Sequence, residues 1–217
     1  EGLDEDIRKS TLESIEIFRS RGAIVEECEL PYLEYAIPAY YAISCSEASS
    51  NLSKYDGIRY GYRTDEYDDI HELYKNSRSE GFGIEVKQRL VIGGLVLSSD
   101  YYEAYYHKAI KIRRLIQESY MKAFKSYDVL IGPTTPKTAP VLNDTTSDSQ
   151  KKKLSGMYSS SINLAGIPAI SIPSGVDKFG LPIGIQLIGD HFKENNIIRA
   201  AYTFECEMGG AIKNEKL

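Results

Sequence analysis

The hydrophobic pattern of the chain is mostly helical. Over several stretches apolar side chains recur every three or four positions, which is the period of a helix with one buried face. Asp4 and Asp100 stand where the first and the longest of these helices begin and can cap them, and Gly22 ends the first one. The predicted helices are residues 4–20, 69–78, 85–97, 100–126 and 194–208.

A further helix is predicted in residues 32–52, where small and aromatic side chains dominate. We expect it to be interrupted near Pro38, because a proline ring removes a backbone donor and clashes with the preceding turn. Short apolar runs bounded by Gly and Pro predict strands. Two of these runs flank the turn-forming residues 176–180 and predict a hairpin beside a helix of small residues. The predicted strands are residues 23–30, 128–131, 169–172 and 183–188.

Helices that alternate with strands favour the α/β class, here a mixed sheet covered by helices on both faces. No linker rich in Pro, Gly and Ser divides residues 1–217, so we expect one structural unit. Residues 136–153 are predicted to form a loop. Within it, residues 143–149 have no periodicity and are expected to be mobile.

Composition narrows the class of protein. The chain has 217 residues, of which 42% are hydrophobic and 26% charged, enough for a sizeable core. Its net charge of -5 argues against a broad nucleic-acid surface. No apolar run approaches the roughly 20 residues of a membrane helix, and no secretion signal is visible. The three cysteines indicate reduced thiols in the cytoplasm, not a disulfide framework or a metal site, and no cofactor is indicated.

Two groups of residues receive no catalytic role from their pattern. Residues 55–63 alternate tyrosines with arginines, which can stack bases. We favour the other interpretation, in which the rings pack at a domain edge and the arginines reach water. His71, His107 and His191 lie on polar helix faces or after a strand, with no second ligand at metal-binding spacing.

Several long blocks resemble the amidase signature family. NLAGIPAISIPSG followed by GLPIGIQLIG, within residues 155–189, is similar to the C-terminal half of that family. SCSEASSNLSKYDGIRYGYR (residues 44–63) and SEGFGIEVKQRLVIGGLVLSSDYYEAYYHKA (residues 79–109) resemble blocks of its glutamyl-tRNA(Gln) amidotransferase A subunits. DVLIGPTTP, from Asp128, is shared more widely in the family. Together the blocks cover nearly the whole chain in the family's order.

The resemblance implies a glutamine amidase that works with B and C subunits in an ATP-dependent complex. Such enzymes use a serine nucleophile, a second serine on a cis peptide and a lysine, because a serine hydroxyl needs an activating base. The ammonia released is transferred by another subunit to glutamyl-tRNA(Gln), so this chain is expected to meet tRNA only indirectly.

The family carries those serines and the lysine in its N-terminal half, and residues 1–217 lack that signature. Ser-x-x-Lys occurs at Ser119/Lys122 and Ser149/Lys152, and neither pair is assigned a role. We therefore expect no catalytic residue here. The chain is expected to be the C-terminal half of an A subunit, a fragment of a longer protein, and inactive by itself. We also expect exposed apolar surface where the N-terminal half docks, and self-association of the fragment.

The resemblance assigns two substrate-binding residues. Arg89 matches the arginine that holds the substrate carboxylate, a task suited to a guanidinium fork. Tyr40 matches a tyrosine that lines the same pocket; a surface ion pair and a core ring are the alternatives for the two residues. Gly156 stands where the family usually has an aspartate facing the substrate amino group. That departure favours a stand-alone amidase acting on another amide, and a non-catalytic scaffold is the third hypothesis.

Overall fold

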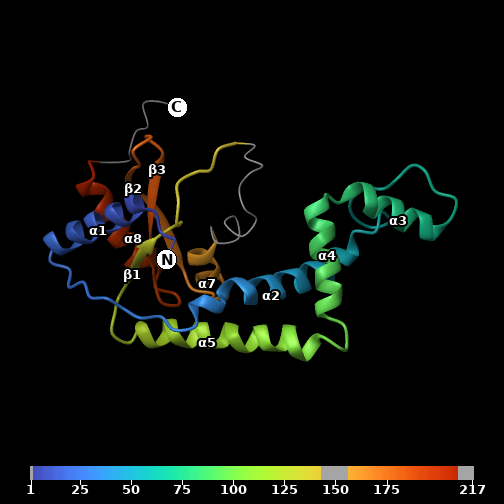
Figure 1. Cartoon of the computed structure of the whole chain (residues 1–217), viewed down its shortest axis with the longest axis horizontal. Coiled ribbons are helices and arrows are strands. Elements are labelled where there is room, and N and C mark those ends of the chain that lie inside the picture. The colour runs from blue at the N-terminus through green and yellow to red at the C-terminus, as the bar shows by residue number, and fades with distance from the viewer. Residues whose placement is uncertain (1, 143–155, 210–217) are drawn as a thin grey trace. The chain divides into compact units, whose positions relative to one another are not determined.

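The computed structural model describes residues 2–142 and 156–209 of the chain (Figure 1). The chain forms two compact units. One comprises Pro38–Ile112, and the other combines Glu1–Ile37 with Arg113–Leu217. Ser149/Lys152 and the loop expected to be mobile, residues 143–149, lie outside the described residues. That the two units belong to one amidase signature half-domain stays a prediction.

The sheet of the second unit has three strands in the order β1-β3-β2. They are β1 (Leu130–Pro133), β2 (Ala169–Val176) and β3 (Pro182–Ile188), and both pairings are antiparallel. β2 and β3 form the predicted hairpin, with a register shift between Pro173 and Gly175. The α/β class is thus confirmed, and all strands of the described residues pair antiparallel.

Asp177 organises the turn between β2 and β3. Its Oδ1 accepts hydrogen bonds from the N–H groups of Phe179 and Leu181, both at 2.8 Å, and its Oδ2 accepts one from Thr138. Partial burial opposes ionisation, but the hydrogen bonds outweigh it and lower the pKa of Asp177. The carboxylate therefore stays ionised at neutral pH, and its contribution to stability is lost only as the pH falls through that lowered pKa.

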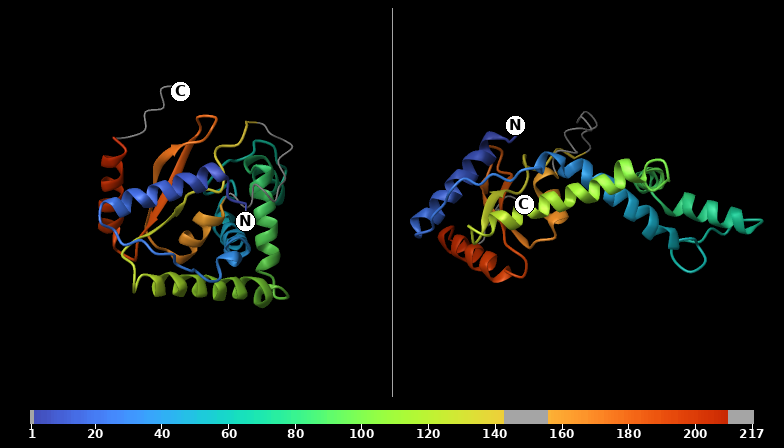
Figure 2. Two further views of the ribbon diagram at one scale, coloured as in Figure 1. Left: turned by 60° about the vertical axis from the view of Figure 1, so that its left-hand side comes forward. Right: turned by 90° about the horizontal axis from the view of Figure 1, so that it is seen from below.

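Helices α1 (Glu5–Ser20) and α8 (Glu194–Glu207) lie beside each other against the strands (Figures 1 and 2). Their interface holds stacked rings of Phe18 and Phe204, whose centroids are 5.6 Å apart. As predicted, Asp4 caps α1, accepting a hydrogen bond from the N–H of Asp6. The hydroxyl of Ser10, on α1, lies 2.8 Å from that of Ser174, on β2. The two ends of the chain thus build one core. Its members include Leu187, Ile197 and Ala201.

Helix α7 (Met157–Ala165) is the predicted helix of small residues, and α5 (Lys108–Ala123) packs on it. Arg113 and Gln117 donate hydrogen bonds to the carbonyls of Leu164 and Ala165, which the last turn of α7 leaves without helical partners. The buried hydroxyl of Tyr120 lies 2.9 Å from that of Ser161. Burial raises the pKa of Tyr120, so the phenol remains neutral.

Three sequence predictions are wrong in detail. Residues 23–30 form no strand, because no neighbouring strand pairs with them, and Ile24 is 91% exposed. α2 (Ala36–Asn51) runs through Pro38 without interruption, since this proline lies in the first turn, where the backbone N–H has no helical partner to lose. Asp100 does not cap the long helix. A π-helical segment, η3 (Tyr102–His107), precedes α5 instead.

The first unit consists of α2, α3 (Ile70–Gly81), α4 (Ile84–Val96), η3 and their connections. α3 and α4 match the predicted helices. Gly93 of α4 lies against α2 so closely that a Cβ there would be 2.0 Å from the carbonyl oxygen of Cys45 and 2.7 Å from the Cβ of Ser49. Only glycine allows this approach. None of the described helices is both long and apolar enough to cross a membrane.

Candidate functional site

The close packing of α2 and α4 places Arg89 against two tyrosines. Arg89 lies one turn before Gly93 on α4, and Tyr41 lies one turn before Cys45 on α2. The guanidinium carbon of Arg89 is 5.7 Å from the centroid of the Tyr41 ring. The neighbouring Tyr40 side chain raises the pKa of Arg89, so the guanidinium is permanently charged.

The charge of Arg89 has no carboxylate partner among the described residues. Arg89 is half-buried, and so are Tyr40 and Tyr41. The Tyr41 ring and the neighbouring Tyr40 side chain restrict the guanidinium and leave its N–H donors available to a ligand. This arrangement suits a bidentate interaction with a carboxylate. The structure brings together the two residues predicted to bind substrate; their role stays a prediction.

Ser119 and Lys122, the Ser-x-x-Lys pair that lies within the described residues, do not form a nucleophile–base arrangement. Ser119 is buried, and its hydroxyl donates to the carbonyl of Ile116 at 2.7 Å, whereas Lys122 is exposed. In α7 the Ser159 hydroxyl donates to the Gly156 carbonyl, and that of Ser161 is near Tyr120. Among the described residues no cluster of His, Cys, Asp and Glu could hold a metal ion.

Gly156 belongs to the sheet-containing unit, where it is the N-cap of α7. Its φ of -89° and ψ of 4° are accessible to other residues, and no side chain caps this end of α7. A Cβ at Gly156 would be 3.5 Å from the Ser160 hydroxyl, an ordinary van der Waals contact. The backbone therefore does not require glycine at position 156. No constraint from the fold explains why this position lacks a carboxylate.

The loop of residues 55–63 agrees only in part with our preferred interpretation. The Tyr55 and Tyr60 rings pack on each other, with centroids 6.2 Å apart, but the side chains of Tyr60 and Tyr62 remain 57% and 53% exposed. Arg63 does not simply reach water, because it donates to the Tyr67 hydroxyl and lies over the Tyr67 ring. A hollow lies beside this loop, with Lys54 and Tyr74 in its lining. The sequence analysis missed both residues, since only the folded loop brings them next to Arg59.

Comparison with known proteins places these features in a family. A family model described as Amidase matches residues 1–198. The chain belongs to the amidase signature family. The A subunit of glutamyl-tRNA(Gln) amidotransferase from Agathobacter rectalis is 56% identical over 205 residues, which are 94% of this chain and 41% of the relative. The A subunit from Lachnospira eligens is 54% identical over 96% of this chain and 44% of its own. The chain thus spans about two fifths of the length of these amidase signature relatives.

Solved structures of the amidase signature family share the fold. The crystal structure of the glutamyl-tRNA(Gln) amidotransferase A subunit from Thermotoga maritima matches with a TM-score of 0.67 and 31% identity, over 94% of this chain and 39% of that one. The structure of 6-aminohexanoate cyclic dimer hydrolase matches with a TM-score of 0.73 over 98% of this chain and 44% of that one. At 15% identity the latter shows the fold alone.

Proposed function

We propose that the chain is the C-terminal part of the A subunit of a glutamyl-tRNA(Gln) amidotransferase. The complete subunit would hydrolyse glutamine in the cytoplasm, and its ammonia would serve to convert glutamyl-tRNA(Gln) to glutaminyl-tRNA(Gln). The observation that carries the proposal is the 56% identity to such a subunit over 94% of the chain. The resemblance supplies the B and C subunits as partners, with tRNA contacted only indirectly.

In this proposal Arg89 holds the α-carboxylate of glutamine, the end that does not react. The neighbouring Tyr40 side chain and the contact with the Tyr41 ring restrict the guanidinium before substrate arrives, which lowers the entropy lost on binding. The serine nucleophile, the second serine and the lysine would come from the remaining part of the complete subunit. The chain would therefore position the substrate without reacting with it.

The first unit exposes an apolar stripe that fits docking of that remaining part. On α4 the side chains of Ile84, Val91 and Leu95 are 68%, 73% and 56% exposed, and they recur at helical spacing. Ile92 of the same helix and Tyr102 of η3 are also exposed. Exposed apolar surface of this extent is typical of an interaction site, so self-association of the isolated chain stays our expectation.

The test is ammonia release from glutamine by the complete protein that contains this chain, with and without B and C subunits. We expect hydrolysis that depends on those subunits, and none from the 217-residue chain alone. Hydrolysis of a different amide with no response to B and C would favour the stand-alone amidase. A complete protein without any amidase activity would favour the scaffold.

Gly156 is the observation that favours the alternative substrate, and it gives a second prediction. In the complete protein, Gly156→Asp is expected to lower the KM for glutamine about tenfold, because the new carboxylate can pair with the substrate ammonium. The measurement is steady-state ammonia release at varied glutamine concentrations. The backbone at Gly156 accommodates the new side chain without strain.

Gly156→Asn is the matched control for this experiment. Asparagine and aspartate both cap a helix well, so each variant should gain a few tenths of a kcal/mol of stability. Only the aspartate carries the charge that an ammonium needs. Equal KM values for the two variants would show that Gly156 does not face the amino group of the substrate.

A further inference from the structure

Residues 52–64 of the first unit form a short 3-10 helix, η2 (Leu52–Lys54), and a following loop, which α3 holds in place. One nitrogen of Arg78, on α3, donates to the carbonyls of Leu52 and Tyr55, both at 2.9 Å. The hydroxyl of Ser77, on the same helix, accepts a hydrogen bond from the N–H of Thr64 at 3.1 Å. Both ends of the loop are thus fastened to one helix, and the loop is preorganised.

The middle of the loop is fixed as well. Gly57 has a φ of +79°, and a Cβ there would lie 2.5 Å from the Ser77 hydroxyl, so the backbone rests directly on α3. Asp56 accepts hydrogen bonds from the N–H groups of Ile58 and Arg59, at 2.9 and 3.2 Å. These bonds, that of Ile58 above all, lower the pKa of Asp56. The carboxylate of Asp56 is therefore committed to the turn of the loop.

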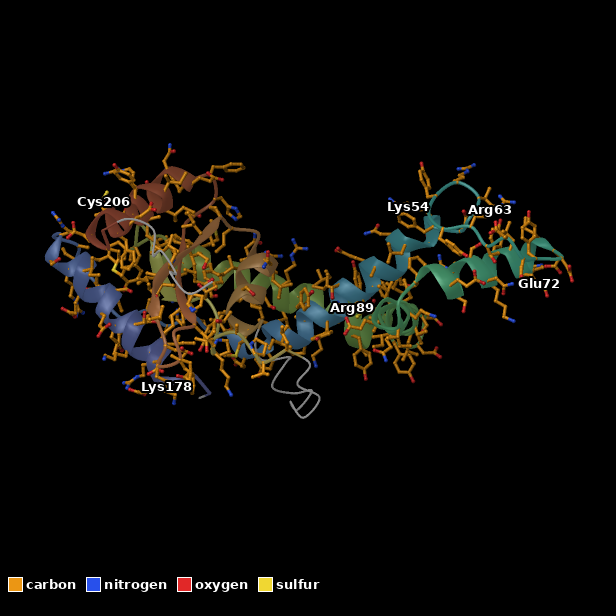
Figure 3. All side chains as sticks on the ribbon, turned by 90° about the horizontal axis from the view of Figure 1, so that it is seen from above. Lys54, Arg63, Glu72, Arg89, Lys178 and Cys206 are labelled. Atoms are coloured by element: carbon orange, nitrogen blue, oxygen red, sulfur yellow. The ribbon has the colours of Figure 1, made fainter. Side chains whose placement is uncertain are left out.

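Beside the loop lies a hollow of about 430 Å³, which we call the tyrosine recess. Its cations are Lys54 and Arg59, which outnumber the single carboxylate of Asp56. Lys54 lies over the Tyr55 ring at 5.6 Å, and the Arg59 guanidinium makes no hydrogen bond or ion pair within the described residues. Both positive charges can therefore meet an incoming anion; Lys54 is labelled in Figure 3. The recess is lined by Lys54, Asp56, Ile58, Arg59, Tyr60 and Tyr74.

We propose that the tyrosine recess binds a carboxylate on an acidic segment of a partner protein. Tyrosine and arginine are enriched at the centres of protein interfaces, where a ring supplies contact area with little entropy to lose. Lys54 and Arg59 complement the charge of a carboxylate, and the rings of Tyr60 and Tyr74 with Ile58 offer apolar contact to its neighbours. The fixed backbone keeps the cost of ordering low.

A nucleic acid fits the tyrosine recess less well than an acidic protein segment. The Tyr55 and Tyr60 rings pack on each other with centroids 6.2 Å apart, and Tyr55 also covers Gly61, so neither is a free stacking platform.

This inference rests on the proposed function, because it takes the partner to be a B or C subunit of the amidotransferase. The test is the affinity of the complete A subunit for B and C, measured by titration at two salt concentrations. Lys54→Gln with Arg59→Gln is expected to weaken association about tenfold and to reduce its salt dependence. Both side chains are on the surface, so the melting temperature should not change.

The matched control removes two charges elsewhere in the first unit. Lys75 and Lys108 are exposed and make no ion pair within the described residues, so Lys75→Gln with Lys108→Gln should change the affinity less than twofold. Equal losses in the two double variants would show a general charge effect and overturn the proposal. Unchanged affinity in the Lys54/Arg59 variant, with association intact in the wild type, would also overturn it and leave the proposed function standing.

A peptide experiment separates the proposed occupant from other anions. The probe is a blocked hexapeptide of alternating Glu and Phe, titrated into the complete A subunit, with free glutamate at equal carboxylate concentration as comparison. We expect the peptide to bind the wild type and to bind the Lys54/Arg59 variant about tenfold less tightly, and glutamate to bind neither detectably at this recess.

Loss of tRNA binding in that variant, with peptide binding unchanged, would identify a nucleic acid and contradict the proposal. If the wild type does not associate with B and C but binds the peptide, the proposed function is wrong, and the recess remains a binding site for another acidic partner.

Discussion

Replacing Arg89 by alanine is expected to raise the KM for glutamine about 30- to 150-fold in the complete protein, with little change in kcat. The expectation follows from the loss of a charge-assisted hydrogen-bond pair, worth about 2–3 kcal/mol. Because the α-carboxylate is far from the reacting amide, its anchor is used equally by substrate and transition state, and the effect falls on KM. The measurement is ammonia release over a wide range of glutamine concentrations.

Three variants serve as controls for Arg89→Ala. Arg89→Lys keeps the charge but loses the planar fork, and should lie between wild type and alanine. Tyr40→Phe removes only the hydroxyl that raises the pKa of Arg89, and should raise KM a few-fold. Arg114 is 79% exposed on α5, and Arg114→Ala should leave KM unchanged. A KM for Arg89→Ala equal to that of Arg114→Ala would show that Arg89 does not bind substrate.

Gly93→Ala is expected to lower the free energy of unfolding by about 3 kcal/mol. The added methyl would lie 2.0 Å from the carbonyl oxygen of Cys45, a backbone atom that cannot rotate away, so α2 and α4 must separate. This cost exceeds the gain of about 1 kcal/mol that alanine brings to a helix interior. Urea denaturation of the 217-residue chain or of the complete protein measures the difference.

The adjacent glycine provides the control for Gly93→Ala. A Cβ at Gly94 would meet nothing closer than the Ser49 hydroxyl at 3.9 Å. Gly94→Ala should therefore stabilise the protein by about 0.5–1 kcal/mol. Opposite signs at neighbouring positions of one helix are the diagnostic result. If both variants were stabilised, the close approach of α2 and α4 would not exist in solution.

Local patterns predicted much of the sheet-containing unit. The hairpin, α1 with its Asp4 cap and α8 with its buried face were all predicted, because each depends on periodicity or on a residue with one strong conformational role. Residues 23–30 show the limit of this reasoning. Their apolar and alternating side chains suit a strand, but a strand needs a partner edge, and no short-range pattern indicates where one lies.

The candidate site was predicted only in part. Arg89 and Tyr40 came from the family resemblance, and no local pattern indicates that α2 and α4 would bring them together. The cause of that approach is Gly93, which in sequence is one of two adjacent glycines with nothing to distinguish it. The tyrosine recess was missed for a similar reason. Its shape depends on Ser77 and Arg78 of α3, which bind backbone atoms more than a dozen residues away.

The order in which a ribosome makes this chain follows from its discontinuous unit. α1 is synthesised before β2, and Ser174 of β2, the hydrogen-bond partner of Ser10, lies 164 residues after Ser10. Residues 38–112 are synthesised before β2 and can fold at that stage. Ile7 and Phe18 of α1 are still exposed then, because the elements that bury them have not yet been made. A nascent chain halted before β3 would therefore hold a folded segment of residues 38–112 and an α1 that still lacks its strand partners, and a chaperone can bind such exposed apolar surface.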